Sequence, residues 1–374
     1  MPKAKSDKEA RSKKTTVASL LKGLEMFDIG HNPEKGVAKA GPDGTPARGV
    51  RIRAGQRMRR DGVMTRTEGP AWMKSTTIAN VKDWLGLDIY NKWVKSRERM
   101  VSDAVSHKIS TTDHTRYPAI SEIIPNLKKR FILRIPPELN PPQPVCLARW
   151  PGSIKREEAK RLFQLWDDLV NPSDGRAFVF HTPDADNRSA TPAAHFGCWC
   201  HYTNTPHITA DSLPEDPIVA ERLRLFLEYV GATIVPAAGN ILEQIAPAQL
   251  GVVNKLQEYC LEECGESLRS RKWLQFQYFV TMAVKEGSSE KSHLDLMDWK
   301  DWLTLVFSIG TYESDSFFVL PQLGLKVNMR PGDGIAFLSN HLMHWATYPT
   351  DGRRLVFTCF VDKITFLRVF GQQR

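Results

Sequence analysis

The sequence predicts an α+β fold with a double-stranded β-helix (jelly-roll or cupin-like) core flanked by helices. The first observation is that Gln275–Asp362 holds about seven or eight short strand-like segments with tight turns between them. The second is a pair of long helical segments just before these strands, which would cover the outer face of one sheet. The third is a set of metal-ligating residue types near the strand ends: His293, Asp295 and His344.

Composition narrows the class of protein. The 374 residues are 41% hydrophobic, with ten Trp and seventeen Phe, so the chain can bury a substantial core. Its unbroken apolar runs fall far short of the ~20 residues of a membrane-spanning helix, and the charged N-terminus lacks the apolar stretch of a secretory signal. Six cysteines without regular spacing indicate a reduced intracellular protein. We expect a monomer with no membrane segment.

A basic extension, residues 1–70, is expected to be largely irregular. It holds sixteen Lys and Arg against eight Asp and Glu, which gives +8 of the net +9 of the whole chain. Such a segment suits a polyanion, most often nucleic acid, and the alternatives are a solvated linker or a nuclear-import signal. We expect residues 71–374 to form a single catalytic domain in the nucleus, with helical support over 71–270 and the metal-binding strands over 271–365.

The supporting half reads mainly as helix. Its pattern turns helical from Ile78 to about His107, and a further helix starts after an N-cap at Ser153. Phe178–Phe180 is a candidate strand, and the proline-rich residues 181–215 are expected to be a long loop. Two later helices are expected at Pro217–Tyr229, closed by Gly231, and at Ile241–Cys264, interrupted at Pro247. The core strands are expected at Gln275–Val284, Trp302–Ile309, Phe317–Leu320, Leu325–Met329, Ile335–Leu338 and Leu355–Val361.

The metal-site prediction starts from spacing. In an extended segment positions i and i+2 point to the same side, so His293 and Asp295 can reach one ion, and His344 can face them across the barrel. Two histidines and one carboxylate bind one face of Fe(II) and leave the other positions open. The alternative is that His293 and Asp295 lie in a solvent-exposed loop and that His344 is a histidine of the hydrophobic core. The H-x-D pair, the distal histidine and an arginine ten residues later together favour iron.

The position of Arg354, ten residues after His344, indicates which cosubstrate the site binds. A keto acid such as 2-oxoglutarate chelates iron at one end and presents a carboxylate at the other, which the planar guanidinium of arginine binds well. Arg353 should point the opposite way, whereas Thr358 shares the parity of Arg354 and could line the same pocket.

Three further residues are candidates for substrate binding. His341 competes with His344 as the distal ligand, but the arginine spacing favours His344 and leaves His341 structural or facing substrate. Asp298 and Asp362 could each accept a hydrogen bond from the exocyclic amine of a base, or could be a solvated loop aspartate or a helix cap.

A cysteine cluster offers a second metal site. Cys198 and Cys200, with a histidine, could bind a structural zinc that Cys260 and Cys264 complete, although C-x-C spacing is a weak signal and a packed, reduced loop is the main alternative. The loop over 181–215 also suits a substrate lid.

The motif His293-Leu294-Asp295-Leu296-Met297-Asp298, with Gly332-Asp333-Gly334, His344 and Arg354, resembles Fe(II)/2-oxoglutarate dioxygenases. More narrowly it is similar to the TET/JBP group of nucleic-acid base oxygenases and, within it, to the short fungal members. The resemblance covers roughly residues 270–365. It implies that His293, Asp295 and His344 bind iron and that Arg354 binds 2-oxoglutarate. Asp298 matches an acidic position that contacts the base in protist relatives, whereas Asp362 stands where they have a base-contacting histidine.

The expected activity is therefore oxidation of the methyl group of a base that has been flipped out of methylated duplex DNA. We expect 5-methylcytosine as the substrate, with N6-methyladenine as the second candidate because of Asp362. Two alternatives remain at this point: an Fe(II)/2-oxoglutarate hydroxylase of RNA or protein, and a non-catalytic cupin-like DNA-binding module.

Overall fold

The computed structural model describes residues 56–58, 64–66, 76–80, 122–123, 129–137, 141–181, 191–201 and 203–371. Most of the basic extension and the continuation of the expected Ile78–His107 helix beyond residue 80 lie outside these ranges. Within them, Ile78 belongs to a strand, Thr76–Asn80, because it pairs in parallel with Ile132.

Two β-sheets form the centre of the molecule. The larger has nine strands in the order β3-β5-β6-β13-β10-β15-β9-β7-β8, and the smaller has four in the order β14-β11-β12-β4. The strands of the larger sheet are β3 (Thr76–Asn80), β5 (Arg130–Arg134), β6 (Val145–Trp150), β13 (Gly334–Phe337), β10 (Thr304–Gly310), β15 (Arg354–Phe360), β9 (Thr281–Glu286), β7 (Ala193–Trp199) and β8 (His207–Ile208). The smaller sheet consists of β14 (Trp345–Ala346), β11 (Phe317–Leu320), β12 (Leu325–Asn328) and β4 (Glu122–Ile123), and β1 (Gln56–Met58) and β2 (Met64–Arg66) form a separate pair.

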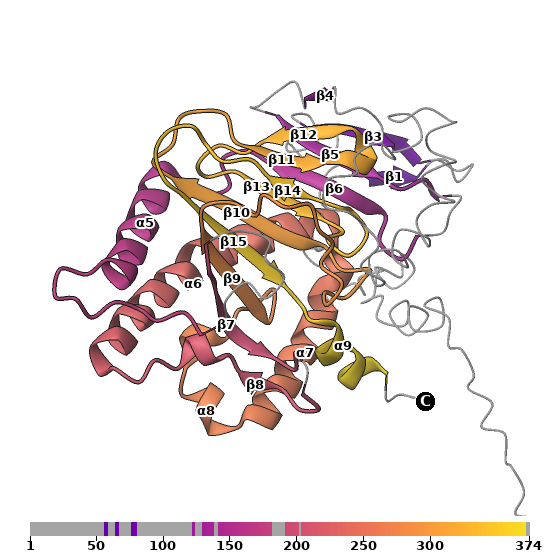
Figure 1. Cartoon of the computed structure of the whole chain (residues 1–374). Helices are drawn as coiled ribbons and strands as arrows, with labels where there is room; N and C mark the ends of the chain where they lie inside the picture. The colour runs from indigo at the N-terminus through magenta and orange to yellow at the C-terminus, as the bar shows by residue number, and fades with distance from the viewer. Residues whose placement is uncertain are drawn as a thin grey trace, which may run out of the picture.

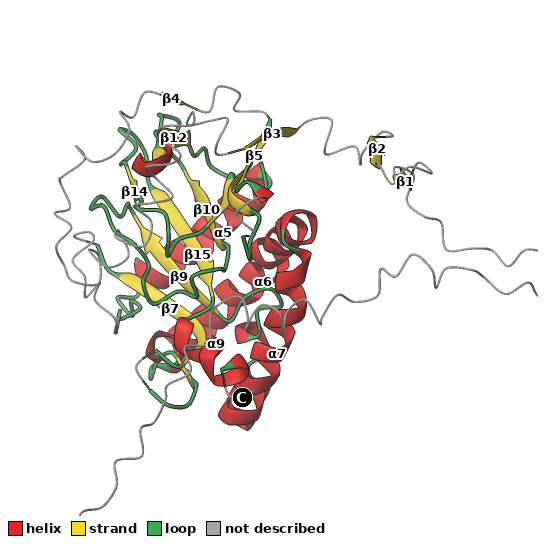
Figure 2. Cartoon of the chain, turned by 90° about the vertical axis from the view of Figure 1, so that its right-hand side faces the viewer, coloured by secondary structure: helices red, strands yellow, loops and turns green. Residues whose placement is uncertain are grey.

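Helices gather on one side of the large sheet. Figure 2 shows α6 and α7 on that side and β12 and β14 on the other, and Figure 1 shows α5 and α6 against the same face. The helical elements are α5 (Arg156–Val170), η4 (Ala210–Ser212), α6 (Pro217–Ile245), α7 (Pro247–Cys264), α8 (Glu266–Arg269), η5 (Lys272–Leu274), η6 (Pro321–Leu323) and α9 (Lys363–Phe370). The predicted α+β class and double-stranded β-helix core are confirmed, with seven core strands between Thr281 and Phe360.

The core strands follow the sequence pattern closely. β10 is apolar apart from Thr304, Ser308 and its terminal glycine, and it is buried along its length because β13 and β15 flank it and helix α5 contacts it. β11 has the predicted bounds. The turn between η6 and β12 uses Gly324 at φ 62°, the left-handed region in which glycine carries no side-chain penalty.

The supporting half differs from its predicted helical character. Residues 71–270 contribute five strands to the large sheet, namely β3, β5, β6, β7 and β8. Residues 181–215 are therefore not one long loop, because β7 pairs with β9 over Ala193–Gly197. Conversely, Phe178–Phe180 forms no strand: the amide of Phe178 donates to the carbonyl of Leu169 at the end of α5. The α5 helix begins after Lys155, two residues beyond the expected cap at Ser153.

Helix α6 runs through both positions where a break is conceivable from sequence. Gly231 does not close it, and Pro236 lies inside it, while the expected break at Pro247 separates α6 from α7. At 29 residues, α6 is long and apolar enough to cross a membrane by length and composition alone. The sequence prediction considered only unbroken apolar runs and therefore did not identify this helix. Of its most apolar window, 61% is buried inside the protein, as in a core helix.

A buried ion pair between Arg149 and Asp333 connects β6 to the turn that precedes β13. Nη2 of Arg149 lies 2.6 Å from Oδ2 of Asp333, with side-chain exposures of 0% and 6%. Asp333 also accepts hydrogen bonds from the amides of Gly152 and Arg330, so one carboxylate connects the end of β6 to the turn before β13. The Gly332-Asp333-Gly334 motif thus has a structural role: it holds the turn before β13 against β6.

We expect Asp333→Asn to lower the free energy of unfolding by about 3–5 kcal/mol, because the substitution removes the negative charge of Asp333 beside the buried Arg149 guanidinium. Urea denaturation measures the change. Asp174→Asn is the matched control, because the Asp174–Arg222 pair is partly exposed and should contribute far less. Equal effects of the two substitutions would contradict the role given to Asp333.

Candidate metal and cosubstrate site

The backbone places His293 beside His344. Each amide donates to the carbonyl of the other, at 3.1 Å and 3.0 Å, which makes an isolated antiparallel bridge at the entrance to β14. The amide of Asp295 donates to the carbonyl of Ser339 at 3.2 Å. The H-x-D segment therefore lies against the chain that carries the distal histidine, as the sequence predicted.

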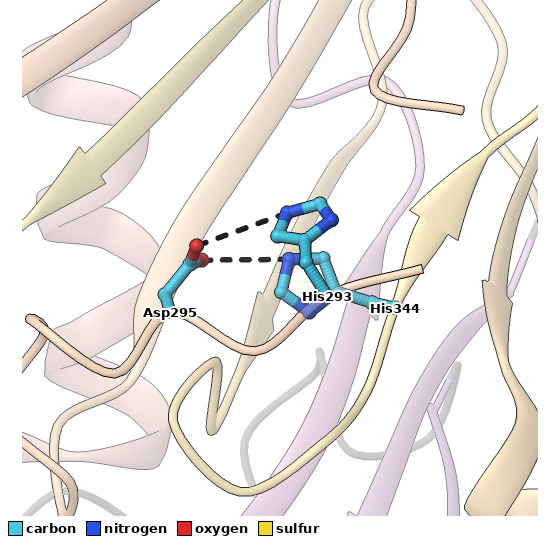
Figure 3. Close-up of side chains that lie close together, drawn as sticks. All are labelled: His293, Asp295 and His344. Carbon is cyan, nitrogen blue, oxygen red and sulfur yellow. Dashed lines mark ion pairs between the residues drawn. The ribbon is translucent and has the colours of Figure 1, made fainter. Parts of the chain in front are cut away.

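The three side chains converge on one point (Figure 3). Nε2 of His293 and Nε2 of His344 lie 3.8 Å and 3.4 Å from the two carboxylate oxygens of Asp295, and the ligand atoms all fall within 4.8 Å of one another. Among the described residues, this is the group of three or more such side chains that could hold a metal ion.

Hydrogen bonds set the tautomer of both histidines. Nδ1 of His293 lies 2.8 Å from the carbonyl of Lys291, and Nδ1 of His344 lies 2.8 Å from the carbonyl of Leu342. Because a carbonyl only accepts, each Nδ1 must carry the proton, and each Nε2 presents a lone pair to the centre of the group. The ring of His344 is further held between Phe318 and Phe337, at centroid distances of 5.4 Å and 4.7 Å. These features fit a divalent first-row metal bound on one face.

Arg354 begins β15 and points into the space between the sheets, where it is buried. Its guanidinium donates to the carbonyls of Gly287 and Thr347 and to the hydroxyls of Ser288 and Ser316. Burial lowers the pKa of Arg354. In the described part of the chain no carboxylate pairs with this cation, so an anionic ligand would supply the missing counter-charge.

Arg353 faces the other way, as predicted. It donates to Asp167 at 2.8 Å and to Glu286 at 3.0 Å, on the side of the sheet covered by α5, and its guanidinium lies over the ring of Phe163. Arg353 and Arg354 therefore point to opposite sides of the sheet. Arg353 forms ion pairs on the side of α5, and Arg354 is the cation inside the pocket.

A pocket of about 290 Å³ joins the metal-ligand group to Arg354. Thr358 lines it, on the same side of β15 as Arg354 and Val356, in agreement with its predicted parity. Lys285, which is buried on β9, lines it as well. The further lining residues include Met297, Asp298, Phe318, Met329, Phe337, Trp345, Phe360 and Asp362.

Asp298 lies at this pocket and is buried. Its Oδ2 accepts hydrogen bonds from the hydroxyls of Thr304 and Ser339, at 2.9 Å and 2.6 Å. The side chain of Asn340 secures the same turn by donating to the carbonyls of Asp295 and Asp298. These hydrogen bonds fix the Asp298 carboxylate in the pocket wall.

Asp362 also lines the pocket but is the N-cap of α9. Its Oδ1 accepts from the amides of Ile364 and Thr365, and its Oδ2 accepts from the hydroxyl of Thr365 and, at 3.4 Å, from the amide of Cys200. These four donors match the roughly four acceptor positions of a carboxylate, so a base amine would have to displace one of them. Burial raises the pKa of Asp362 against the effect of these hydrogen bonds.

His341 does not lie with the other candidate residues. Its Nε2 is 3.8 Å from a carboxylate oxygen of Asp301, and its carbonyl accepts from the side chain of Gln322. His341 is neither part of the metal-ligand group nor a lining residue of the pocket, so the predicted substrate contact is not supported by its position.

The predicted zinc ligands are divided between two places. Sγ of Cys198 lies 3.2 Å from Sγ of Cys264, and hydrogen bonds to the Cys260 and Cys264 thiols, together with burial, raise the pKa of Cys198. Cys200 instead lies at Thr365, through both its thiol and its amide. The geometry is that of buried free thiols packed between β7 and α7.

Sequence reasoning missed the wall formed by β7. His195 and Trp199 line the pocket, although residues 181–215 were expected to be a loop. His201, which was expected in a substrate lid with Asn187, Arg188, Tyr202 and Asn204, lines the pocket as well. The signal was the alternation of Ala193, His195, Gly197, Trp199 and His201, which strand geometry brings to one side. Of the residues expected in a lid, Asn187, Arg188 and Tyr202 lie outside the described residues.

Comparison with solved structures finds similar folds at low sequence identity. NgTET1 in complex with 5mC DNA matches over 65% of this chain and 82% of its own, with 16% identity and a TM-score of 0.46. The viral collagen prolyl hydroxylase vCPH from Paramecium Bursaria Chlorella virus-1, in its 2OG complex, matches over 58% and 95%, with 12% identity and a TM-score of 0.28. An oxidoreductase of the 2OG-Fe(II) oxygenase family from Burkholderia pseudomallei matches over 57% and 82%, with 13% identity and a TM-score of 0.29.

No protein-family model matches the chain, and no curated protein matches it significantly. At these TM-scores, the roles of individual residues depend on this chain's own geometry.

We expect the purified chain to bind one equivalent of Fe(II) or Mn(II), and His344→Ala to weaken that binding about 100-fold or more, because one of three ligands is lost. Isothermal titration under anaerobic conditions measures both affinities. His341→Ala is the matched control, since it removes the competing histidine at Asp301. Equal loss in both variants would contradict the assignment of His344.

Proposed function

We propose that this chain is an Fe(II)- and 2-oxoglutarate-dependent oxygenase that oxidises the methyl group of a methylated DNA base. The observation that carries the chemistry is that one pocket holds a two-histidine, one-carboxylate group and a buried arginine, Arg354. Among the described residues, this arginine donates to carbonyls and hydroxyls and pairs with no carboxylate. The first set suits iron, and the second suits the far carboxylate of a keto acid.

Iron bound at this group would supply the activation of O₂, coupled to oxidative decarboxylation of 2-oxoglutarate to succinate and CO₂. The protein's part is positioning. His293, Asp295 and His344 hold one face of the metal, and Arg354 orients the cosubstrate along β15. Apolar lining from Phe318, Met329, Phe337 and Val356 keeps water out, which strengthens the attraction between the guanidinium and a carboxylate.

The choice of DNA rests on the sequence and on Asp298. The H-x-D-x-x-D motif resembles that of the TET/JBP group, and its last residue lines the pocket in a fixed orientation. The amino group of a flipped base could donate to this carboxylate. We propose 5-methylcytosine as the substrate and N6-methyladenine as the second candidate, since both carry an exocyclic nitrogen at the edge of the ring.

The remaining proposals concern the whole chain. Residues 71–374 would act as one catalytic unit, because strands from both halves build the sheet behind the pocket. Residues 1–70 would contact phosphates or direct the protein to the nucleus, since they carry nearly all of its net positive charge.

We expect succinate formation to rise well above its unstimulated rate when a duplex with 5-methylcytosine or N6-methyladenine is added with iron, 2-oxoglutarate and O₂. Mass spectrometry of nucleosides should show the oxidised base. The same duplex without methyl groups and a methylated RNA are the controls. Stimulation by RNA or a protein substrate alone would replace the DNA proposal. Absence of any 2-oxoglutarate consumption would instead favour a binding module.

We expect Arg354→Lys to weaken 2-oxoglutarate binding about ten- to 100-fold, because lysine keeps the charge but loses the two-pronged hydrogen bonds to a carboxylate (about 1.5–3 kcal/mol). Isothermal titration in the presence of Mn(II) measures the affinity. Arg353→Lys is the neighbouring control, since this residue faces α5 and should leave the affinity unchanged. If the control weakened binding as much, the effect would be structural.

A further inference from the structure

The pocket-facing side of β7 carries a stack of three rings. The centroids of His195 and Trp199 lie 5.0 Å apart with an interplanar angle of 31°, and those of Trp199 and His201 lie 4.4 Å apart at 26°. All three side chains line the pocket that also holds the metal-ligand group. We refer to His195, Trp199 and His201 as the ring stack.

Gly197 brings two members of the ring stack together. Four residues of fully extended chain would separate His195 from Trp199 by ~13 Å, yet their rings meet at 5.0 Å. Between them Gly197 has φ 111°, and a Cβ at this position would lie 2.3 Å from the carbonyl oxygen of Val280. The conformation and the close approach both require glycine, and they bend the strand so that the rings gather.

His201 is held in an unfavourable conformation. Its φ of 48° makes it the non-glycine residue with positive φ in the described part of the chain. Two contacts fix it: its ring stacks on Trp199, and the preceding amide, that of Cys200, donates to Thr365 at 3.0 Å and to Asp362 at 3.4 Å. Residues kept in such regions of backbone conformation cluster at functional sites, where the surrounding structure holds them.

The groups that share the pocket with the ring stack indicate what it would bind. Met297, Phe360 and the carboxylate of Asp298 line the same pocket. Burial lowers the pKa of His201, so near neutral pH its imidazole is uncharged and carries one donor and one acceptor nitrogen. Flat aromatic faces beside groups that can hydrogen-bond to a ring edge suit a planar heteroaromatic ring, whereas an aliphatic or cationic side chain would use little of this surface.

We propose that the ring stack is the substrate-orienting wall of the pocket and that it selects a planar heteroaromatic ring, which Trp199 and His201 hold toward the metal-ligand group. This rests on the proposed function and deepens it, because it specifies a nucleobase over an amino-acid side chain. His195 is a positioning residue, since its ring lies against that of Trp199.

The test measures binding without turnover, so that its outcome does not depend on the proposed reaction. The Mn(II)- and 2-oxoglutarate-loaded chain without O₂ is titrated with a labelled duplex that carries one 5-methylcytosine, and with the same duplex that carries an abasic site there. Fluorescence anisotropy reports both affinities. A peptide containing methyl-lysine and one containing proline compete as the aliphatic probes.

The wild-type chain should bind the base-containing duplex more tightly than the abasic one. Trp199→Leu should reduce this preference about five- to 150-fold, to the limit of no preference, whereas Trp199→Phe should retain most of it because a ring remains. Affinity for 2-oxoglutarate should stay unchanged in both variants. Preferential competition by a peptide, or an undiminished preference in Trp199→Leu, would overturn the proposal, and so would a wild-type chain that does not distinguish the two duplexes.

His201→Gly adds a readout that a purely structural role would not produce. Glycine suits a φ of 48°, so the melting temperature should stay the same or rise, while the preference for the base-containing duplex falls. His207→Ala, at the nearby β8, is the control and should change neither quantity. A fall in melting temperature with the preference intact would make His201 a structural residue. If the binding results hold but no methylated DNA is oxidised, the reaction proposal fails and the ring-stack proposal stands.

Discussion

The reciprocal backbone hydrogen bonds between His293 and His344 are the constraint on which the site depends. They join the chain that leaves the large sheet after β9 to the chain that enters the small sheet at β14. Because each residue uses both of its main-chain polar groups on the other, the two side chains start from fixed neighbouring positions. The carbonyls of Lys291 and Leu342 then fix the rings, and a metal would meet ligands that are already oriented.

Strand β15 connects this site to the rest of the fold. Arg353, just before this strand, pairs with Asp167 of helix α5 and with Glu286 of the neighbouring strand β9. The inward residues of β15, such as Arg354 and Thr358, line the pocket. At its end the chain turns into α9, whose N-cap Asp362 also accepts a hydrogen bond from the amide of Cys200. The last core strand thereby connects Arg354, the ring stack and the covering helices.

The sequence predicted those parts of the site that have local signals. β11 and its glycine turn, the H-x-D spacing and the parity of Arg353 and Arg354 follow from short-range geometry, so they could be read without a structure. Strand β7 could not be predicted in this way. The prolines beside it and the glycine, cysteine and histidine within it obscured the alternation of apolar and polar residues. Pairing with β9, a contact between distant segments, makes it a strand. Helix α6 passes through Gly231 because packing in the core overrides local propensity.

The aspartates show where sequence reasoning stops. Asp298 and Asp362 were equivalent candidates, each able to cap a helix or to contact a base. Four donors from the protein surround Asp362 at the start of α9, and the hydroxyls of Thr304 and Ser339 donate to Asp298 at the pocket wall. The donors around each carboxylate depend on which segments fold together there, and short-range sequence patterns do not reveal that.

The central claim is that one keto acid is held jointly by the metal at His293, Asp295 and His344 and by Arg354. A keto acid chelated to Fe(II) absorbs visible light through charge transfer from the metal to the ligand, so anaerobic absorption spectroscopy tests the claim directly. The account predicts a visible band that requires both Fe(II) and 2-oxoglutarate, is absent in Asp295→Ala, and needs more 2-oxoglutarate in Arg354→Lys. No band in the wild-type chain, or an undiminished band in Asp295→Ala, would contradict it.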